Sequence, residues 1–369
     1  MTVPSQILVL QGEDDQAALI AKRVREFGVS ATVWPCDGGI TPLPAGVCGI
    51  IVTGATTDAR RDAVIDAVLK GPVPVLAVGA GFDLMNVALG GQQRHMGRLA
   101  SGMTTVRTDD RSGLLDQVPA PLSVWMRRTS VVAGLAAALT AIAWDVDGHV
   151  VGAESQARQR FGVRFHPHLA ASDSGRLILR RFVHDICGCR SDWRLPEQIP
   201  GLLADVREAV GSRPVIALLS GGLYSAVTVG LLQRALPEPQ VVALHVDTGV
   251  MRQGESERVL ALAQAMNLRR IEVRDAHRDV LAALGGLHRT VEKHACLAQQ
   301  LQARAIHAAA RAEGTDRPTL AFGQVSPAGD MAPVAAGHTC NRHLSAGDGG
   351  DAVITPLHGY FRDEVRQLG

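Results

Sequence analysis

Short apolar runs alternate with stretches of helical periodicity along the first part of the chain. Residues 7–10 form a continuous apolar run typical of a buried strand, and residues 17–27 repeat apolar side chains near helical spacing. The same reasoning predicts strands at 31–34, 49–52 and 73–78, and a helix at 63–69. Strands separated by helices are typical of βαβ units, so this part of the chain is expected to build a parallel sheet.

The pattern changes after residue 120 and later returns. Strands without long helices between them are predicted at 122–126, 141–146 and 162–165, before an amphipathic helix at 176–187. Residues 191–201 contain Trp193, prolines and several charges, which indicates a linker. Beyond it, helices are predicted at 202–210, 225–235, 255–266, 279–284 and 295–311, and strands at 215–219, 241–246, 270–273 and 320–322. The glycine-rich residues 326–351 predict a mobile loop.

These patterns predict an α/β protein with two doubly wound, mainly parallel-sheet domains at residues 1–190 and 202–369, joined by the linker at 191–201. A net charge of +1 and an aromatic content of 4% exclude a general attraction to nucleic acid or to an anionic membrane. No apolar run approaches the ~18 residues that span a bilayer, and no signal-peptide pattern is present. The 6 scattered cysteines are expected to be reduced thiols, so we expect a soluble cytoplasmic protein.

The most informative motif begins where the apolar strand at 215–219 ends. It runs through Ser220, Gly221, Gly222, Leu223, Tyr224, Ser225 and Ala226 directly into a helix. Glycines allow a ligand to approach the backbone, and the free N–H groups at a helix start favour an anion. The next strand ends at Asp247, at the edge where parallel sheets bind ligands. A tight strand–helix turn without a ligand would give the same pattern.

The motif resembles the pyrophosphate-binding loop of the ATP pyrophosphatase superfamily, Ser-Gly-Gly-x-Asp-Ser, and in particular the GMP synthetase family. Matching segments follow in order through nearly the whole chain, at residues 7–10, 19–29, 49–54, 84–91, 161–167, 181–187, 245–252 and 361–369. The resemblance implies a flavodoxin-type class I glutamine amidotransferase domain and then an ATP pyrophosphatase-like domain. It also implies ATP and Mg²⁺ as ligands of the loop.

The resemblance places glycine where the amidotransferase nucleophile should be. That family has a cysteine in a Gly-x-Cys-x-Gly elbow, and residues 77–81 here read Ala-Val-Gly-Ala-Gly, with Gly79 at the cysteine position. His166 stands at the position of the base, but His168 replaces the carboxylate that should orient it. The oxyanion segment also departs from the family, reading Thr-Gly-Ala-Thr at 53–56. We therefore predict that the glutaminase is inactive and that His166 is vestigial.

The second half departs from the family as well. Tyr224 replaces the loop aspartate, which weakens the case for Mg²⁺. The segment at 336–341 lacks the family's lysine, for which Lys293, Arg252 or Arg289 are candidate replacements. Two groups have metal-ligand spacing, the pair of His166 and His168, and His338 with Cys340 and His343. Each lacks a further ligand at standard spacing, so no metal site is predicted.

Three hypotheses follow. The first is a GMP synthetase-like pseudoenzyme that binds an adenine nucleotide and has a regulatory or accessory role with a protein partner of the purine pathway. The second is an adenylating ligase that uses free ammonia or another amine, as in ammonia-dependent GMP synthesis, with Asp247 holding the metal. The third is an interaction protein without a ligand. The family continues beyond the end of this sequence into a dimerisation domain that helps to hold XMP, so the oligomeric state stays open.

Overall fold

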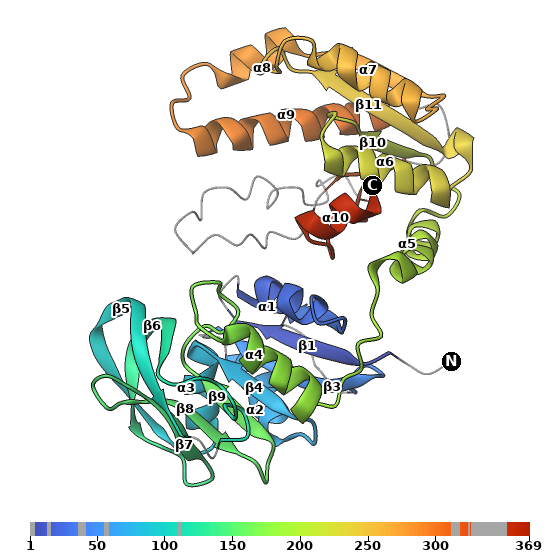
Figure 1. Ribbon diagram of the computed structural model, residues 1–369. Coiled ribbons are helices and arrows are strands. Elements are labelled where there is room, and N and C mark those ends of the chain that lie inside the picture. Colours follow the sequence, from blue (N-terminus) through green and yellow to red (C-terminus); the bar gives the residue numbers. More distant parts are fainter. Residues whose placement is uncertain are drawn as a thin grey trace. The chain divides into compact units, whose positions relative to one another are not determined.

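The chain folds into two compact units, and the boundary between them along the sequence falls between Trp193 and Arg194. The computed structural model describes residues 4–12, 16–35, 42–54, 59–109, 112–310, 318–323, 325 and 353–369. The glycine-rich segment at 326–351, including His338, Cys340 and His343, lies outside the described residues, as do residues 55 and 56 of the oxyanion segment at 53–56. Each unit contains its own sheet (Figure 1).

The first unit is built on a mixed sheet that has nine strands in the described part of the chain. Its parallel half has the order β2 (Ser30–Pro35), β1 (Gln6–Gln11), β3 (Val47–Thr53), β4 (Val75–Val78) and β9 (Arg160–Val163). This 2-1-3-4-5 order is the flavodoxin type, as expected. The antiparallel half continues with β8 (Val150–Ser155), β7 (Thr140–Asp145), β5 (Gln92–Thr108) and β6 (Leu122–Gly134). The mainly parallel character predicted for this unit therefore holds for one half of the sheet.

Three of the helices described in the first unit lie close to predicted ones, whereas α3 (Ala80–Ala88) was not predicted as a helix from the apolar pattern. The other three are α1 (Gln16–Arg25), α2 (Ala59–Lys70) and α4 (Gly175–Arg180), which continues as the π-helical segment η1 (Arg181–Ile186). Buried side chains of β1, β3 and β4 pack against α2 and α3 to form one apolar cluster. This packing fixes the carboxyl ends of the parallel strands, where β4 turns into α3.

The second unit has a sheet that is parallel throughout. Its order is β12 (Ile271–Asp275), β11 (Val241–Asp247), β10 (Val215–Leu218), β13 (Thr319–Ala321) and β14 (Val353–Ile354). The chain order 3-2-1-4-5 reverses between β10 and β13, and such a switch point is where doubly wound sheets bind ligands. The helices are α5 (Leu195–Val210), α6 (Leu223–Ala235), α7 (Glu255–Ala265), α8 (His277–Leu284), α9 (Thr290–Ala310) and α10 (Arg362–Leu368), with a 3₁₀ turn, η2 (Glu238–Gln240).

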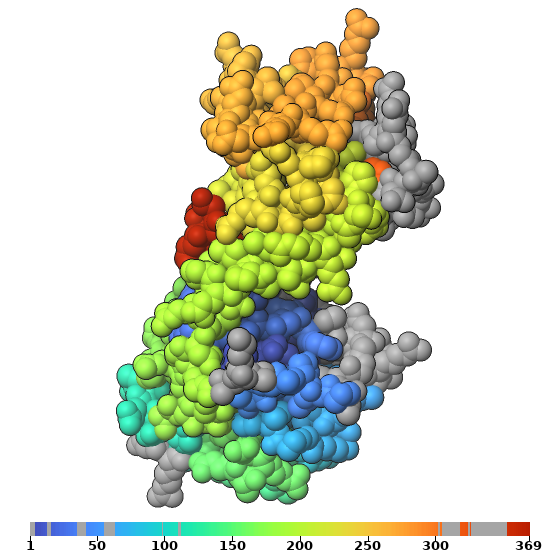
Figure 2. All heavy atoms as spheres, turned by 90° about the vertical axis from the view of Figure 1, so that its right-hand side faces the viewer, coloured from blue at the N-terminus to red at the C-terminus, as the bar shows by residue number. Residues whose placement is uncertain are grey.

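The predicted linker at 191–201 is too long, because helix α5 begins at Leu195 rather than at residue 202. Proline is tolerated in the first turn of a helix, where its missing N–H has no partner to lose, so Pro196 does not exclude this start. Leu195 is buried and anchors the first turn. The C-terminal helix α10 packs against α5 and α6 and reaches the surface, where it is red in Figure 2. None of the helices in the described segments is long and apolar enough to cross a membrane.

Candidate functional site

Gly79 lies at a sharp turn between β4 and α3. Its φ of 61° and ψ of −125° form a backbone conformation that is costly for residues other than glycine. Its N–H donates to the Val163 carbonyl at 2.9 Å, which joins the turn to β9. The following Gly81 lies so close to β3 that an added Cβ would be 2.5 Å from the Val52 carbonyl oxygen. The strand–turn–helix elbow is therefore present, with no side chain at the position of the nucleophile.

The ring of His166 lies against Gly79. A Cβ on Gly79 would be 2.8 Å from His166 Cε1, closer than ordinary carbon contacts allow. The backbone N–H of His166 donates to the Trp125 carbonyl at 3.0 Å, and the centroids of the two side-chain rings are 5.2 Å apart. The Nδ1 atom of His166 is buried with no hydrogen-bond partner among the described residues. The fold thus brings Gly79 and His166 together, but the imidazole fills the space that a side chain at position 79 would need.

His168 is buried beside His166 and is held by α1. Its Nε2 lies 2.6 Å from Gln16 Oε1, and Arg23 Nε donates to its carbonyl at 3.1 Å. Burial, helped by Arg127 and Arg164, lowers the pKa of His166 to about 4. Burial also lowers the pKa of His168, with smaller contributions from His166 and Arg23. Both imidazoles are neutral at pH 7, and His168 supplies no negative charge to stabilise a protonated His166.

The buried histidine pair predicts a loss of stability in acid. The folded state keeps His166 neutral down to about pH 4, whereas the unfolded chain binds the proton near pH 6.5. The free energy of unfolding is therefore highest above pH 6.5 and decreases as the pH falls from 6.5 to about 4. One pKa unit is worth about 1.4 kcal/mol, so His166 alone accounts for a decrease of about 3 kcal/mol. Denaturant unfolding between pH 8 and about pH 4 measures this slope. It is expected to flatten in His166→Asn but not in His288→Asn, which changes an exposed histidine.

A group of metal-ligating side chains lies in the turn between β7 and β8. Within the described segments, Asp145, Asp147 and His149 are the only such group of three. Arg128 forms ion pairs with both aspartates, and Asp145 also accepts the backbone N–H groups of Asp147 and His149. A guanidinium already occupies the place that a cation would take, which argues against a metal ion in this group.

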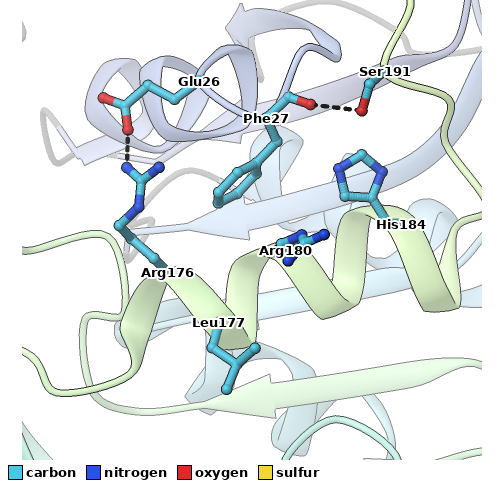
Figure 3. A pocket seen from close by; sticks show the side chains of 7 residues that line it. All are labelled: Glu26, Phe27, Arg176, Leu177, Arg180, His184 and Ser191. Atoms are coloured by element: carbon cyan, nitrogen blue, oxygen red, sulfur yellow. Dashed lines mark hydrogen bonds and ion pairs between the residues drawn. The ribbon is translucent and has the colours of Figure 1, made fainter.

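A cavity of about 500 Å³ opens between α1 and α4 in the first unit (Figure 3). Arg176 forms an ion pair with Glu26 across it, and Ser191 Oγ donates to the Phe27 carbonyl at 2.9 Å. Arg180 faces the same cavity. None of the elbow residues is among those that line it. This cavity was not predicted from the sequence, because its residues come from three separate segments.

In the second unit, the motif that starts at Ser220 forms an ordered loop between β10 and α6. The buried Ser225 holds it, because its Oγ accepts the Ser220 N–H at 3.2 Å and donates to the Gly222 carbonyl at 2.8 Å. Gly221 has a φ of 81°, and Gly222 and Leu223 are exposed. The first N–H groups of α6 point out of the helix without an intrahelical acceptor. The loop therefore offers exposed backbone N–H donors, which suit an anion, while its two serine hydroxyls bond to each other and to the Gly222 carbonyl.

The loop lies at the switch point of the second sheet. An added Cβ on Gly323, which follows β13, would lie 2.7 Å from the Tyr224 carbonyl carbon, so the two backbones touch. On the other side, an added Cβ on Gly221 would lie 2.6 Å from Val259 of α7. The loop and the start of α6 are therefore packed between the end of β13 and α7, at the switch point of the sheet.

Hydrogen bonds connect Asp247 to this loop through two residues that the sequence did not single out as site residues. His245 Nδ1 lies 2.9 Å from the Leu219 carbonyl, next to Ser220, and His245 Nε2 lies 3.0 Å from Ser256 Oγ. Ser256 in turn donates to Asp247 Oδ2 at 2.9 Å. The fold thus brings Asp247 and the loop into one network. His245 and Ser256 lie eleven residues apart on β11 and α7, and no local pattern marks such a pair.

Asp247 has a third partner in His277, which begins α8. His277 Nε2 lies 2.7 Å from Asp247 Oδ1, and the Gly249 N–H donates to the same oxygen at 3.1 Å. The Gly249 N–H, followed by His277 and Ser256, lowers the pKa of Asp247. The hydrogen bond to Asp247 raises the pKa of His277. The pair is an exposed ion pair at the edge of the sheet.

The other nominated residues of the second unit lie in different surroundings. The ring of Tyr224 packs against the apolar core of the unit and is half-buried. Lys293 lies on α9 with its side chain exposed, and Arg289 forms an ion pair with Glu292. No hydrogen bond or ion pair in the described part of the chain joins Lys293, Arg252 or Arg289 to the loop.

Comparison with known proteins decides the family. Residues 9–186 match the family model of class-I glutamine amidotransferases. The GMP synthase [glutamine-hydrolyzing] of Alkalilimnicola ehrlichii is 33% identical over 384 residues, which are 99% of this chain and 72% of that protein. The corresponding protein of Thiobacillus denitrificans is 32% identical over 99% of this chain and 73% of its own length. This chain belongs to the GMP synthase family.

Among solved structures, a glutamine amidotransferase from Thermotoga maritima is similar to half of the chain. Its TM-score is 0.40 and its sequence identity 16%, over 50% of this chain and 82% of that chain. The similarity to GMP synthases covers both candidate sites. The elbow at Gly79 lies within the amidotransferase match. The loop at Ser220 lies beyond it, within the similarity to complete GMP synthases.

Proposed function

We propose that this member of the GMP synthase family has no glutaminase activity, binds an adenine nucleotide at the Ser220 loop and acts as a regulatory or accessory protein of purine metabolism. One observation carries the proposal. Gly79 provides the elbow without a nucleophile, and the His166 ring fills the space beside it. Covalent catalysis at this position needs a thiolate, which glycine cannot supply.

Glutamate release from glutamine tests the first half of the proposal. The full chain is incubated with glutamine, with and without ATP and XMP, and the GMP synthase of Thiobacillus denitrificans serves as the active control. Loss of a nucleophile lowers the rate of such enzymes by about a million-fold, so we expect release at the background level. Release above background that persists in His166→Ala would point to a contaminating enzyme. Release that this variant abolishes would overturn the proposal.

The nucleotide-binding half is supported by the ordered loop, its exposed N–H groups and its place at the switch point of the sheet. Calorimetric titration with ATP and with AMP measures it directly. The proposed partner is an enzyme of the purine pathway, whose rate should change when this chain and ATP are added together. Absence of binding to either nucleotide would contradict this half.

An adenylating ligase that uses free ammonia is the second candidate, and the same loop favours it. It needs only the second unit to be active. Pyrophosphate release from ATP that depends on XMP and ammonia would support the ligase. ATP binding without such release would favour the accessory role.

A further inference from the structure

Two positions in the second unit, 224 and 247, are expected to supply carboxylate oxygen to Mg²⁺, and neither offers a carboxylate that is free of protein donors. Mg²⁺ in nucleotide sites is held by one or two carboxylates together with the phosphates, in near-ideal octahedral geometry. At the loop, Tyr224 provides a neutral ring, and that ring packs into the core. Asp247 is the remaining nominated carboxylate.

The oxygens of Asp247 are already engaged by protein donors. Oδ1 accepts the Gly249 N–H at 3.1 Å and faces His277 Nε2 at 2.7 Å, and Oδ2 accepts the Ser256 hydroxyl at 2.9 Å. A carboxylate has about four lone-pair positions, so three of them are filled. The one position left is on Oδ2, beside the bond to Ser256, which also contacts His245. A Mg²⁺ ion bound there would share the carboxylate with His277, which is already its ion-pair partner. A single lone pair on a carboxylate that is already paired is a poor fit for the metal.

The loop, in contrast, is equipped for the phosphate itself. Its exposed donors are the first backbone N–H groups of α6, which can donate to phosphate oxygens without a cation, whereas the Ser220 hydroxyl is already bonded to Ser225 Oγ at 3.1 Å. We infer that this site binds nucleoside phosphates in their metal-free form, an inference that rests on the nucleotide binding proposed above. It distinguishes this chain from an adenylating enzyme, in which a metal ion neutralises the charge that develops on the phosphates.

The first test compares ATP binding in excess EDTA with ATP binding in excess Mg²⁺, by calorimetry on the full chain. We expect binding that is at least about tenfold tighter in EDTA, because excess Mg²⁺ leaves little ATP in its metal-free form. Equal binding in the two buffers, or tighter binding with Mg²⁺, would overturn the inference and leave nucleotide binding intact. Absence of heat in both buffers would instead contradict the proposed function, and the inference with it.

Two matched variants separate the charge at position 224 from the loss of the ring. Tyr224→Asp and Tyr224→Asn remove the same packing, but only the first adds a carboxylate. We expect Tyr224→Asp to weaken ATP binding about tenfold in EDTA, through repulsion of the phosphates, and to recover when Mg²⁺ is added. Tyr224→Asn should behave as the wild type does, with tighter binding in EDTA than in Mg²⁺. If the two variants respond identically to Mg²⁺, the residue at position 224 does not decide metal use and the inference fails.

A spectroscopic readout confirms the result without relying on affinity. Mn²⁺ is a paramagnetic substitute for Mg²⁺, and its electron paramagnetic resonance signal changes when the protein holds it beside ATP. The wild-type chain should leave the signal of Mn²⁺–ATP unchanged. Tyr224→Asp should alter it. A change already present in the wild type would show that the described donors bind the metal after all.

Discussion

Replacing Gly79 by cysteine will destabilise the first unit and will not restore a glutaminase. The backbone at Gly79, with φ 61° and ψ −125°, costs a residue with a Cβ about 1–3 kcal/mol. The new Cβ would also lie 2.8 Å from His166 Cε1, so the ring must move. We expect a total loss of about 2–4 kcal/mol in the free energy of unfolding, measured by chemical denaturation.

Glutamate release should stay at background in the same variant. Removing the acid that orients the histidine of a catalytic triad costs about four orders of magnitude in rate. His168 is a buried neutral imidazole and cannot replace that acid. A cysteine at position 79 would therefore face a base that is displaced and poorly oriented.

Gly148 provides the control for the backbone strain. It has a φ of 82° in the turn between β7 and β8, and an added Cβ would meet nothing within 4 Å. Gly148→Ala should therefore cost about 1 kcal/mol, from the backbone alone. In Gly79→Ala/His166→Ala, the ring contact is removed and the cost of Gly79→Ala should fall toward that of Gly148→Ala. Equal losses in the two single alanine variants would show that His166 does not fill the space.

Parallel strands such as β1, β4 and β11 were predictable because each is a short apolar run that is largely buried. Strand β5 was missed for the opposite reason. Among the residues of β5 whose burial is described, only Val106 is buried, so its conformation comes from pairing with β6 rather than from an apolar pattern of its own. The start of α5 was missed because prolines and charges resemble a linker, whereas the burial of Leu195 is a tertiary effect.

The candidate sites divide in the same way. Local motifs identified Gly79, the Ser220 loop and Asp247, because glycine, serine and strand ends carry their own signals. The sequence could not show that the His166 ring enters the space of the missing side chain. The partners of Asp247 were also missed, since Ser256 and His277 come from different helices. Those contacts make the difference between a free metal ligand and a carboxylate whose oxygens are engaged.

The largest expected effect in the second unit comes from one buried hydroxyl. Ser225→Ala should weaken ATP binding at least about tenfold and lower the stability of the unit by about 1–3 kcal/mol. The reason is that Ser225 Oγ bonds to the Ser220 N–H and to the Gly222 carbonyl, so its loss leaves both groups without that partner and releases the loop. Calorimetry with ATP and denaturant unfolding measure the two effects.

Thr228, one turn further along α6, is the matched control. Its Oγ1 is buried and has no hydrogen-bond partner in the described part of the chain. Removing such an unsatisfied hydroxyl costs nothing and relieves a desolvation penalty, so Thr228→Val should be neutral or stabilising by about 1 kcal/mol and should leave ATP binding unchanged. The contrast between two buried hydroxyls on one helix separates an effect on the loop from a general effect on the helix.

The double variant Ser220→Ala/Ser225→Ala distinguishes a ligand-binding chain from a purely structural one. If the second unit serves only as an interaction surface, the double variant changes local stability and nothing else. If it binds a nucleotide, ATP binding must be lost while the far-ultraviolet circular dichroism and the unfolding transition of the first unit stay as in the wild type. Because the loop bonds lie within residues 220–225 and the elbow lies in the other unit, a nucleotide effect confined to this variant would assign binding to the second unit alone.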